Sequence, residues 1–564
     1  MHWKRVATHS KNWTGLRASL FAMLAYALAI AALDQSVGIG FESNDDVAAM
    51  MIAHGFGIAA TPSAVLPFSN VLQGYFVQWI GWPFGVAGYS LYLMGALVLA
   101  GGAAVGWLTR LNGQPWIHGL LVGALLLRPM MQPQFTIIAC FLAAAACLGL
   151  MAYARDGLRR HLALAAVFAV LAFLMRSQSL ILVLLIAAPL VVQVSLLRAP
   201  IVWVAGLAAL AVMLSAAWWD HRQLAAPEWQ AFLTLDRLRG VFTDFGMGSA
   251  VAARPDVMQA VGWSANDLAL IRNFWLVDPD MAHPDRLRGA ITAIGVGATF
   301  RLDHTLLDTA FKQITARDLW AAWLALSVAA VMLRRRTLAR AAAGLLLLIG
   351  ALLLLSAAGR VGIGRVYYPA ISALALLCLG LAPPSSEVWR RRGLATAALA
   401  SAALTFTIAE PEARARAALV VGIQPHMEIL EAARPLVAWG SVLPFEALFP
   451  PLARRETIPR LAIFGIGVTS LAPYGVAHWG GNIDGMIRRF TSEQGLYLFA
   501  WGGGIAMLEI YCQERFGGTL RQRAVQQIGW RRYAEINCLP ASQQPLSWTG
   551  ADPAAIGANY TGPR

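Results

Sequence analysis

The amino-acid sequence predicts a polytopic α-helical membrane protein that ends in a small extracytoplasmic α/β domain. Of its 564 residues, 58% are hydrophobic and only 13% are charged, whereas a soluble domain of this size carries about 25% charged residues. Apolar stretches of membrane-spanning length recur up to about residue 410, and a helix needs about 20 such residues to cross a bilayer. Beyond that point short strand patterns alternate with helical ones, which is typical of an α/β domain.

Basic residues give the chain a formal net charge of +14. Many of its arginines lie in short segments between apolar stretches, where basic residues orient a membrane protein by staying on the cytoplasmic side. When the spans alternate, the N-terminus shares that side, so we expect it to be cytoplasmic. The charge therefore needs no nucleic-acid partner. These arginines are Arg110, Arg155, Arg159, Arg160, Arg198, Arg334, Arg335, Arg336, Arg340, Arg390, Arg391 and Arg392.

About eleven transmembrane helices are expected. They divide the chain into a membrane module, 1–410, and an outer domain, 411–564, with a large outer loop of short helices lying on the bundle at 220–317. The expected spans are about 18–40, 84–108, 116–129, 133–153, 161–175, 178–197, 200–219, 318–333, 339–358, 366–382 and 393–409.

Outer loop 1, at 41–83, follows the first span. Within it we expect a short helix over 47–57, a break at Thr61-Pro62-Ser63, and an amphipathic helix over 68–82. The second helix combines tryptophans with amide side chains, a composition that suits the membrane surface.

The outer domain shows strand patterns, helical patterns and two cysteines. Two expected strands end alike, in Ala438-Trp-Gly440 and Ala500-Trp-Gly502. Cys512 and Cys538 could form a disulfide in an oxidising compartment, whereas Cys140, Cys147 and Cys378 lie in apolar stretches and are expected to pack. Strands are expected at 420–423, 436–439, 461–466, 496–501 and 532–536, and helices at 424–433, 444–449 and 504–516.

Three carboxylates, Glu42, Asp45 and Asp46, crowd against the outer end of the first span. Carboxylates at the edge of a bilayer are costly to desolvate and tend to be functional. One of them could act as a general base on a hydroxyl group, and Asp45 or Asp46 is the candidate. A solvated loop or an acidic helix N-terminus is the alternative. The cluster is also the one place where a divalent cation such as Mg²⁺ or Mn²⁺ could bind.

Four arginines fall at the outer ends of spans, against the trend of the others: Arg128, Arg176, Arg360 and Arg365. A guanidinium holds a phosphate through two parallel hydrogen bonds, so these residues predict an anion site on the face that carries the acidic cluster. Snorkelling of the side chains to lipid headgroups is the alternative.

Further polar residues lie at the same level of the membrane. Asn44, Asn70, His54 and Gln134 are candidates to contact a substrate. For His54 the alternative is a structural polar group near the interface.

The motif Glu42-Ser-Asn-Asp-Asp46, directly after the first span and followed by interfacial helices, resembles outer loop 1 of the GT-C glycosyltransferases. Pro62-Ser63, Phe68-Ser-Asn70 and Gly74 resemble elements of bacterial members. The resemblance covers about residues 1–410. It implies an inverting enzyme of the cytoplasmic membrane that uses a polyprenyl-phosphate-linked sugar. It also implies that the motif carboxylate is the base, and that an outer-face arginine contacts the lipid phosphate.

The resemblance leaves open whether the acceptor is a glycan, a lipid or a protein. A transporter or flippase of lipid-linked glycans is one alternative function, but transporters favour symmetric repeats and mid-membrane charges, and the sequence shows neither. A ligase or polymerase of lipid-linked glycans shares the outer arginines and large loops. The acidic motif directly after the first span favours the transferase.

Overall fold

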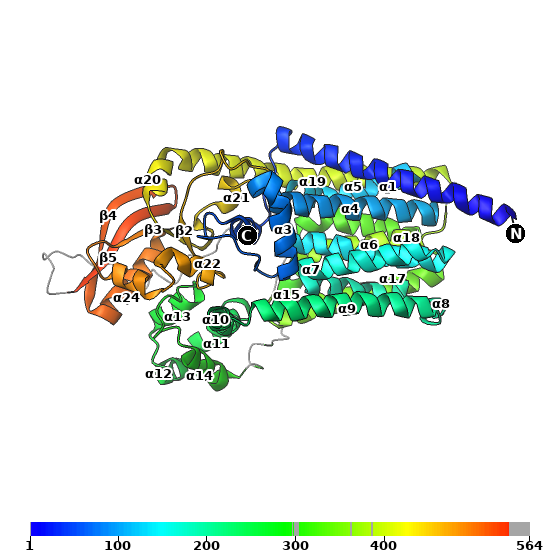
Figure 1. Cartoon of the computed structure of the whole chain (residues 1–564). Coiled ribbons are helices and arrows are strands. Elements are labelled where there is room, and N and C mark those ends of the chain that lie inside the picture. Colours follow the sequence, from blue (N-terminus) through cyan, green and yellow to red (C-terminus); the bar gives the residue numbers. More distant parts are fainter. Residues whose placement is uncertain are drawn as a thin grey trace.

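The computed structural model describes residues 2–295, 297, 300, 304–360, 364–384 and 387–540. A long helical bundle forms one part of the molecule and a small sheet domain the other (Figure 1). The bundle helices are α1 (His2–Ser36), α4 (Gly88–Asn112), α5 (Pro115–Met131), α6 (Phe135–Asp156), α7 (Arg159–Val191), α9 (Pro200–Gln223), α16 (Trp320–Val331), α17 (Arg335–Ala357), α18 (Gly364–Leu381) and α19 (Val388–Ile423).

Within the described residues, eight helical segments are long and apolar enough to cross a membrane. The number becomes nine if the bent pair Leu306–Ile314 and Arg317–Val331 forms one span, and the shorter apolar helix α5 lies beside them. The prediction of a polytopic helical membrane protein is therefore confirmed.

Helix α7 contains two of the expected spans, because the chain reverses within it at Arg176. The backbone there is non-helical, with φ −162° and ψ 97°. Just after the reversal, Ser179 Oγ donates to the carbonyl of Thr136 at 3.2 Å, at the start of α6. At the far end of the second half, Arg340 Nε donates to the carbonyl of Pro189 at 2.7 Å. With α7 divided in this way, each of the eleven expected ranges falls largely on a helix.

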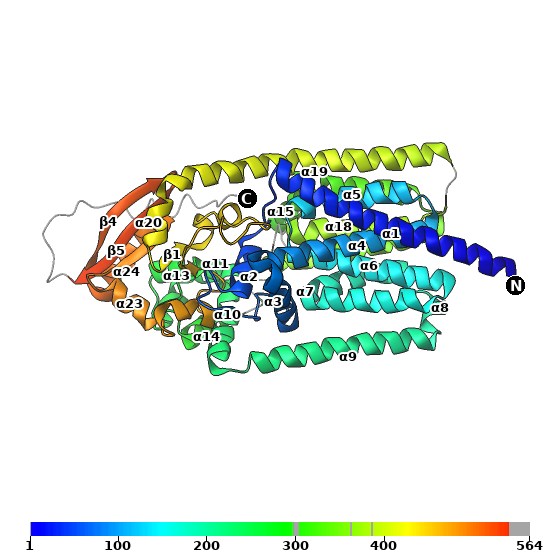
Figure 2. The same cartoon turned by 45° about the horizontal axis from the view of Figure 1, so that its top comes forward.

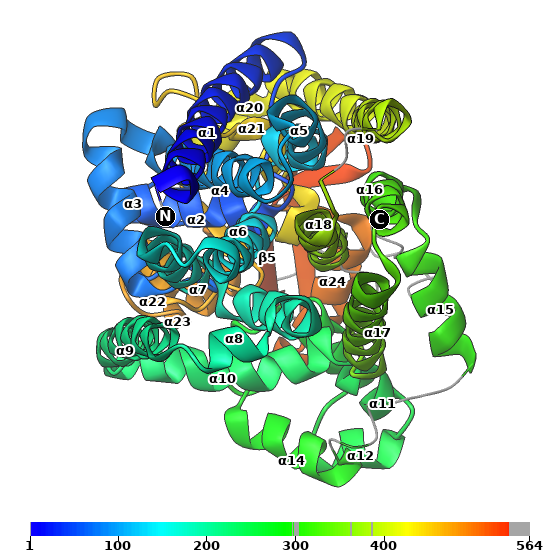
Figure 3. The ribbon, with the colours of Figure 1, turned by 90° about the vertical axis from the view of Figure 1, so that its right-hand side faces the viewer.

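The helices of the bundle are buried to the extent that the distribution of their apolar residues predicts. Helix α6 is apolar and rich in alanine all round, and it lies in the middle of the bundle seen end-on (Figure 3). A helix without a polar face has to be covered on every side. Helix α9 lies at the edge and exposes Trp203, Leu207 and Leu214, which suits contact with lipid.

The bundle has two chemically different ends. The arginine end carries the arginine-rich turns; there Arg110 and His161 both contact Asp156. The domain end carries outer loop 1 and faces the sheet domain (Figure 1). The arginines that the sequence assigns to one side thus gather at one end of the bundle.

The sheet domain contains β1 (Leu436–Trp439), β2 (Ile463–Ile466), β3 (Leu496–Trp501), β4 (Gly518–Ile528) and β5 (Arg531–Pro540). Their order is β2-β1-β3-β5-β4. Strand β1 pairs in parallel with β2 and β3, whereas β5 pairs antiparallel with β3 and β4. Four predicted strands are confirmed. Strand β4 was not predicted, because it is an edge strand and its many polar residues give no apolar alternation.

One predicted strand and the predicted domain boundary are wrong. Residues 420–423 are not a strand but the end of α19, which continues past the predicted domain boundary at 410. This helix has 36 residues and is therefore about 54 Å long, longer than the hydrocarbon core of about 30 Å. It runs beyond the bundle to reach α20 (Met427–Ala432) (Figure 2). Residues 541–564 of the predicted domain lie outside the described residues.

The large outer loop packs mainly against the sheet domain, not along the bundle as expected. Trp263, Trp275 and Met281 share one hydrophobic core with Val437 and Phe464 of the sheet. The apolar sides of the short helices and the apolar face of the sheet both need to be covered, and packing them together buries both. The helices are α10 (Pro227–Asp244), α11 (Met247–Ala252), α12 (Pro255–Ala260), α13 (Ala265–Arg272), α14 (Pro284–Ile294) and α15 (His304–Ile314).

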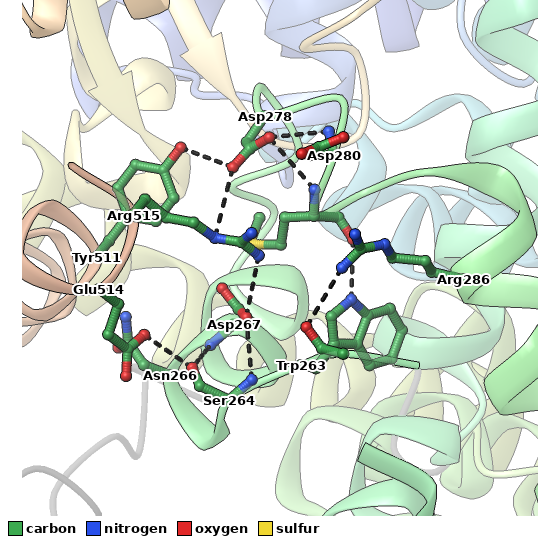
Figure 4. A network of polar contacts seen from close by, with 12 residues as sticks. Trp263, Ser264, Asn266, Asp267, Asp278, Asp280, Arg286, Tyr511, Glu514 and Arg515 are labelled. Atoms are coloured by element: carbon green, nitrogen blue, oxygen red, sulfur yellow. Dashed lines mark hydrogen bonds and ion pairs between the residues drawn. The ribbon is translucent and has the colours of Figure 1, made fainter. Parts of the chain in front are cut away.

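A polar network fastens this loop to α24 (Gly502–Phe516) (Figure 4). Arg515 contacts Asp267 at 3.1 Å and Asp278 at 3.9 Å, and Tyr511 donates to Asp278 at 2.9 Å. A disulfide between Cys512 and Cys538 then joins α24 to β5. The network fixes the segment between α13 and Asp278 over the sheet.

Candidate active site

The acidic motif lies at the domain end, where α2 (Asn44–His54) begins. Its three carboxylates point to different partners. Glu42 contacts Arg128, Asp45 contacts Arg365, and Asp46 accepts hydrogen bonds from neutral groups. The cluster that the sequence shows is therefore divided into three separate environments.

Asp46 is completely buried, with 0% of its surface exposed. Its carboxylate accepts hydrogen bonds from Ser43 Oγ at 2.9 Å, Tyr89 Oη at 3.0 Å and the Phe135 backbone N–H at 3.1 Å. Burial raises the pKa of Asp46 to about 8, because the charged form is poorly solvated there. Asp46 thus ties the start of α2 to α4 and α6, and it lines neither of the two cavities described below.

Asp45 faces the opposite way. Its Oδ2 accepts from Nη1 of Arg365 at 2.8 Å, and the side chains are 19% and 35% exposed. Arg365 lies at the start of α18, at a sequence separation of 320 from Asp45. Asp45 also lines a cavity at the junction of the bundle and the sheet domain, so a substrate there could reach its carboxylate.

Glu42 belongs to a partly buried ion-pair group. Arg128 Nη2 contacts Glu42 at 3.3 Å, and its Nη1 contacts Asp318 at 3.2 Å. The guanidinium also lies over the Tyr368 ring, 5.1 Å from its centroid. Burial raises the pKa of Glu42, and the charge of Arg128 opposes that shift. Two carboxylates already neutralise Arg128, so this geometry favours a structural role over the predicted phosphate contact.

The other two predicted arginines differ from each other. Arg360 Nη2 contacts Asp244 at 2.6 Å, so it too has a carboxylate partner. Arg176 lies over the rings of Phe68 and Phe135, at 4.9 and 5.7 Å. Across the described part of the chain, no carboxylate lies within ion-pair distance of Arg176. The positive charges of Arg365 and Arg360 act on it together with the negative charge of Asp45. Arg176 is therefore the member of the set whose charge is least compensated.

The first cavity has a volume of about 340 Å³ and lies where three parts of the chain meet. Outer loop 1 contributes Asn44 and Asp45, the large outer loop contributes residues 272–274, and the sheet domain contributes the ends of its three parallel strands. Its polar, aromatic and glycine lining comprises Asn44, Asp45, Arg272, Asn273, Phe274, Trp439, Gly440, Ser441, Phe445, Gly465, Gly467, Thr469 and Trp501.

A second cavity, of about 450 Å³, adjoins the first and shares Pro67, Val468 and Thr469 with it. Arg176 lines it, and Trp229 and Phe232 provide apolar walls. This cavity lies beside the turn in α7, where the bundle ends. It therefore offers a cation and apolar surface next to the cavity that contains Asp45.

Among the remaining candidates, Asn44 lines the first cavity, but Gln134 and His54 face no cavity described here. Gln134 is buried and caps α6, accepting from the Ile137 N–H at 3.0 Å. His54 packs against Gly81 and Gly88, and burial lowers its pKa to about 4, so it is neutral. Substrate contact by these two residues is not supported.

Asn70 lines the second cavity, yet both ends of its amide are used. Its Oδ1 caps α3 (Val71–Phe84) by accepting from the Leu72 N–H at 3.0 Å, and its Nδ2 donates to the Ala216 carbonyl at 3.0 Å. The contacts make Asn70 a positioning residue for α3.

The predicted Mg²⁺ or Mn²⁺ ion would need the acidic cluster to converge on one point. Glu42, Asp45 and Asp46 instead turn to separate partners. In the described ranges, no group of three or more His, Cys, Asp or Glu side chains is arranged to hold a metal ion. The cluster therefore does not fit a divalent cation in this arrangement.

Arg272 and Phe274 also line the first cavity but were not predicted from the sequence. Phe274 has φ +67°, an unusual conformation for a bulky residue, which local sequence does not reveal. The repeated Ala-Trp-Gly pattern did indicate this cavity in the sequence, because Trp439 and Trp501 end two parallel strands there.

Together the fold and the site define a class: a multi-span membrane protein in which a carboxylate, paired with an arginine, lines a cavity between the helical bundle and the sheet domain. Neither a protein-family model nor a curated protein matches the chain. Among solved structures, the chain is similar to ArnT from Cupriavidus metallidurans in the apo state. The two are 15% identical over 92% of this chain and 97% of that chain, with a TM-score of 0.40.

Proposed function

We propose that this protein is a GT-C-type glycosyltransferase of the cytoplasmic membrane. It transfers a sugar from a polyprenyl-phosphate-linked donor to a glycan, lipid or protein acceptor on the outer face. The observation that supports this proposal best is the Asp45–Arg365 pair, in which a carboxylate that lines the first cavity contacts a cation able to bind phosphate.

Asp45 is the base in this proposal. The acceptor oxygen attacks the anomeric carbon, the bond from that carbon to the phosphate oxygen breaks, and its electron pair leaves with the polyprenyl phosphate. The acceptor proton passes to the Asp45 carboxylate. A phosphate leaving group needs no protonation, so one base suffices. Asp46 is unsuited to the task because it is buried and engaged by three donors.

Arg365 and Arg176 are the phosphate ligands in this proposal. A guanidinium has five N–H donors, so the contact between Arg365 and Asp45 leaves donors for a phosphate. Arg176 adds a cation in the adjoining cavity, whose apolar walls suit a lipid chain. Arg128 is less suited because two carboxylates already contact it, and Arg360 is less suited because its carboxylate partner is Asp244 and not the base Asp45.

The test compares two neighbouring, isosteric substitutions in purified full-length protein. Radiolabelled polyprenyl-phosphate sugars are supplied with a membrane and cell-wall extract as the acceptor source, and transfer of label is measured. We expect Asp45→Asn to lower transfer about 10²–10⁴-fold, the usual contribution of a general base. Asp46→Asn should retain most of the activity, because an amide can keep its buried contacts.

Full activity of Asp45→Asn would overturn the assignment of the base. A strain lacking the protein distinguishes the alternative functions. Accumulated donor together with an outer glycan that lacks one sugar supports transfer. Intact outer glycans with donor retained on the inner leaflet would indicate a flippase, and loss of whole glycan chains would indicate a ligase or polymerase.

A further inference from the structure

The sheet domain presents a binding edge to Asp45. Strands β2, β1 and β3 run parallel, so their carboxyl ends meet at one edge. The chain leaves β1 for β2 on one side and then crosses to β3 on the other. In such sheets ligands bind outside the carboxyl ends of the strands, where the connections diverge. Here that position lies between Trp439 and Trp501, both of which line the cavity that contains Asp45.

Aromatic rings form one wall of this cavity. The Trp439 ring lies 5.1 Å from that of Trp501 and 5.1 Å from that of Trp275, measured between centroids. Phe274 reaches the cavity from the large outer loop, held at φ +67°. Such backbone conformations are strained and persist where the surroundings impose them, often at binding sites. The network around Arg515 holds this loop on the sheet domain.

Polar groups and glycines form the rest of the lining. Ser441 and Thr469 offer hydroxyl groups, and Asn273 lines the cavity with an amide whose Nδ2 donates to the Ala269 carbonyl at 2.8 Å. Gly467, after β2, has open space where a side chain would project. Its backbone φ is not positive, so a larger residue there would enter the cavity without strain. A substrate can therefore approach the backbone closely at this strand end.

We propose that this cavity is the acceptor subsite and that its ligand is a saccharide unit. A sugar ring has apolar C–H faces, which pack on aromatic rings, and a rim of hydroxyls, which amide, hydroxyl and carboxylate groups bind. The lining supplies both kinds of surface around Asp45. The inference rests on the proposed transferase function and narrows its acceptor from a glycan, lipid or protein to a glycan.

Binding, measured without turnover, tests this proposal separately from catalysis. Saturation-transfer NMR is recorded on the detergent-solubilised full-length protein. The probes are glucose, galactose, mannose, arabinose and N-acetylglucosamine, beside glycerol phosphate and a serine-threonine peptide. We expect at least one saccharide to receive saturation at its ring protons, and Gly467→Leu to weaken that signal at least about tenfold by filling the site.

Three variants complete the design. Gly422→Leu is the matched control, because Gly422 also has open space around it but lies on the exposed end of α19. Asp45→Asn should still bind the saccharide while losing transfer, which separates the subsite from the base. Ser441→Phe fills the cavity from another strand end and provides a second test in case Gly467→Leu does not fold. Folding is checked by the apparent Tm.

Three results would overturn the proposal: no saccharide binds the wild type, saccharide binding persists in both folded cavity-filling variants, or the peptide or glycerol phosphate binds in their place. If Asp45→Asn is inactive and the wild type binds no saccharide, the transferase proposal stands and only the subsite is removed.

Discussion

Nη1 of Arg365 lies 2.8 Å from Oδ2 of Asp45, although 320 residues separate them in the sequence. The contact joins the first helix after span one to the start of α18. It pairs a guanidinium with a carboxylate that lines the first cavity, and it is the basis for the first prediction.

Arg365→Gln removes the cation but keeps a polar side chain of similar length. We expect kcat/KM for the lipid-linked donor to fall about 10²–10³-fold, the usual effect of losing one donor to a developing anionic charge. Transfer kinetics provide the measurement. Arg336→Gln, in an arginine-rich turn at the other end of the bundle, is the control. Equal kinetics for the two variants would contradict the role of Arg365.

Asp46 should make stability depend on pH. Burial raises its pKa from 3.8 to about 8, so the folded protein binds the proton more tightly than the unfolded chain. Its stabilising contribution is full below about pH 4 and is lost as the pH rises toward 8. Between pH 5 and 8 the apparent Tm of wild type should therefore fall more steeply than that of Asp46→Asn. Parallel Tm curves would contradict this assignment.

Arg128→Ala should destabilise the protein without altering donor affinity. It leaves Glu42 and Asp318 without their cation. Breaking a buried pair costs about 3–5 kcal/mol, and we expect roughly 2–4 because Asp318 is 32% exposed. The apparent Tm and the KM for the donor are measured together. Arg317→Ala, at an exposed neighbouring arginine, is the control, and a raised KM with an unchanged Tm would instead support phosphate binding.

The Cys512–Cys538 disulfide closes a segment with a sequence separation of 26. A loop of that size stabilises a fold by about 3–4 kcal/mol in the chain-entropy account. Reductant should therefore lower the apparent Tm of the wild type and leave the Cys512→Ala/Cys538→Ala variant unchanged. Mass spectrometry without reductant checks the bond directly, and two free thiols would refute it.

The arginine-rich turns predict the membrane orientation, with the sheet domain outside the cytoplasm. Alkaline phosphatase, which is active only outside the cytoplasm, should be active when fused after Pro540. It should be inactive when fused at Gly113 or Gly157, in turns at the arginine end. The reverse pattern would invert the proposed topology and place Asp45 on the cytoplasmic side.

Much of the architecture could be predicted because it depends on local composition. The long apolar stretches indicate spans wherever they occur, since an unpaired backbone cannot cross a bilayer. The arginine-rich turns gather at one end of the bundle, as predicted. Strands 436–439 and 496–501 carry enough β-branched, aromatic and apolar residues to be recognised. Strand β4 does not, because an edge strand can be polar on most of its length.

In the acidic motif, the local sequence determines where the carboxylates lie along the chain, and the tertiary structure determines which of them faces the cavity. Sequence alone placed Asp45 and Asp46 at the start of a helix beyond span one, and it marked four arginines on the same side. It could not distinguish the two carboxylates, because successive helical residues point about 100° apart and either could face inward. Packing of α2 against α4 and α6 buries Asp46 beside Tyr89 and leaves Asp45 to Arg365 and the cavity. The difference between Asp45 and Asp46 therefore depends on contacts between residues far apart in the chain, up to 320 positions for Asp45 and Arg365, and such contacts cannot be inferred from local sequence.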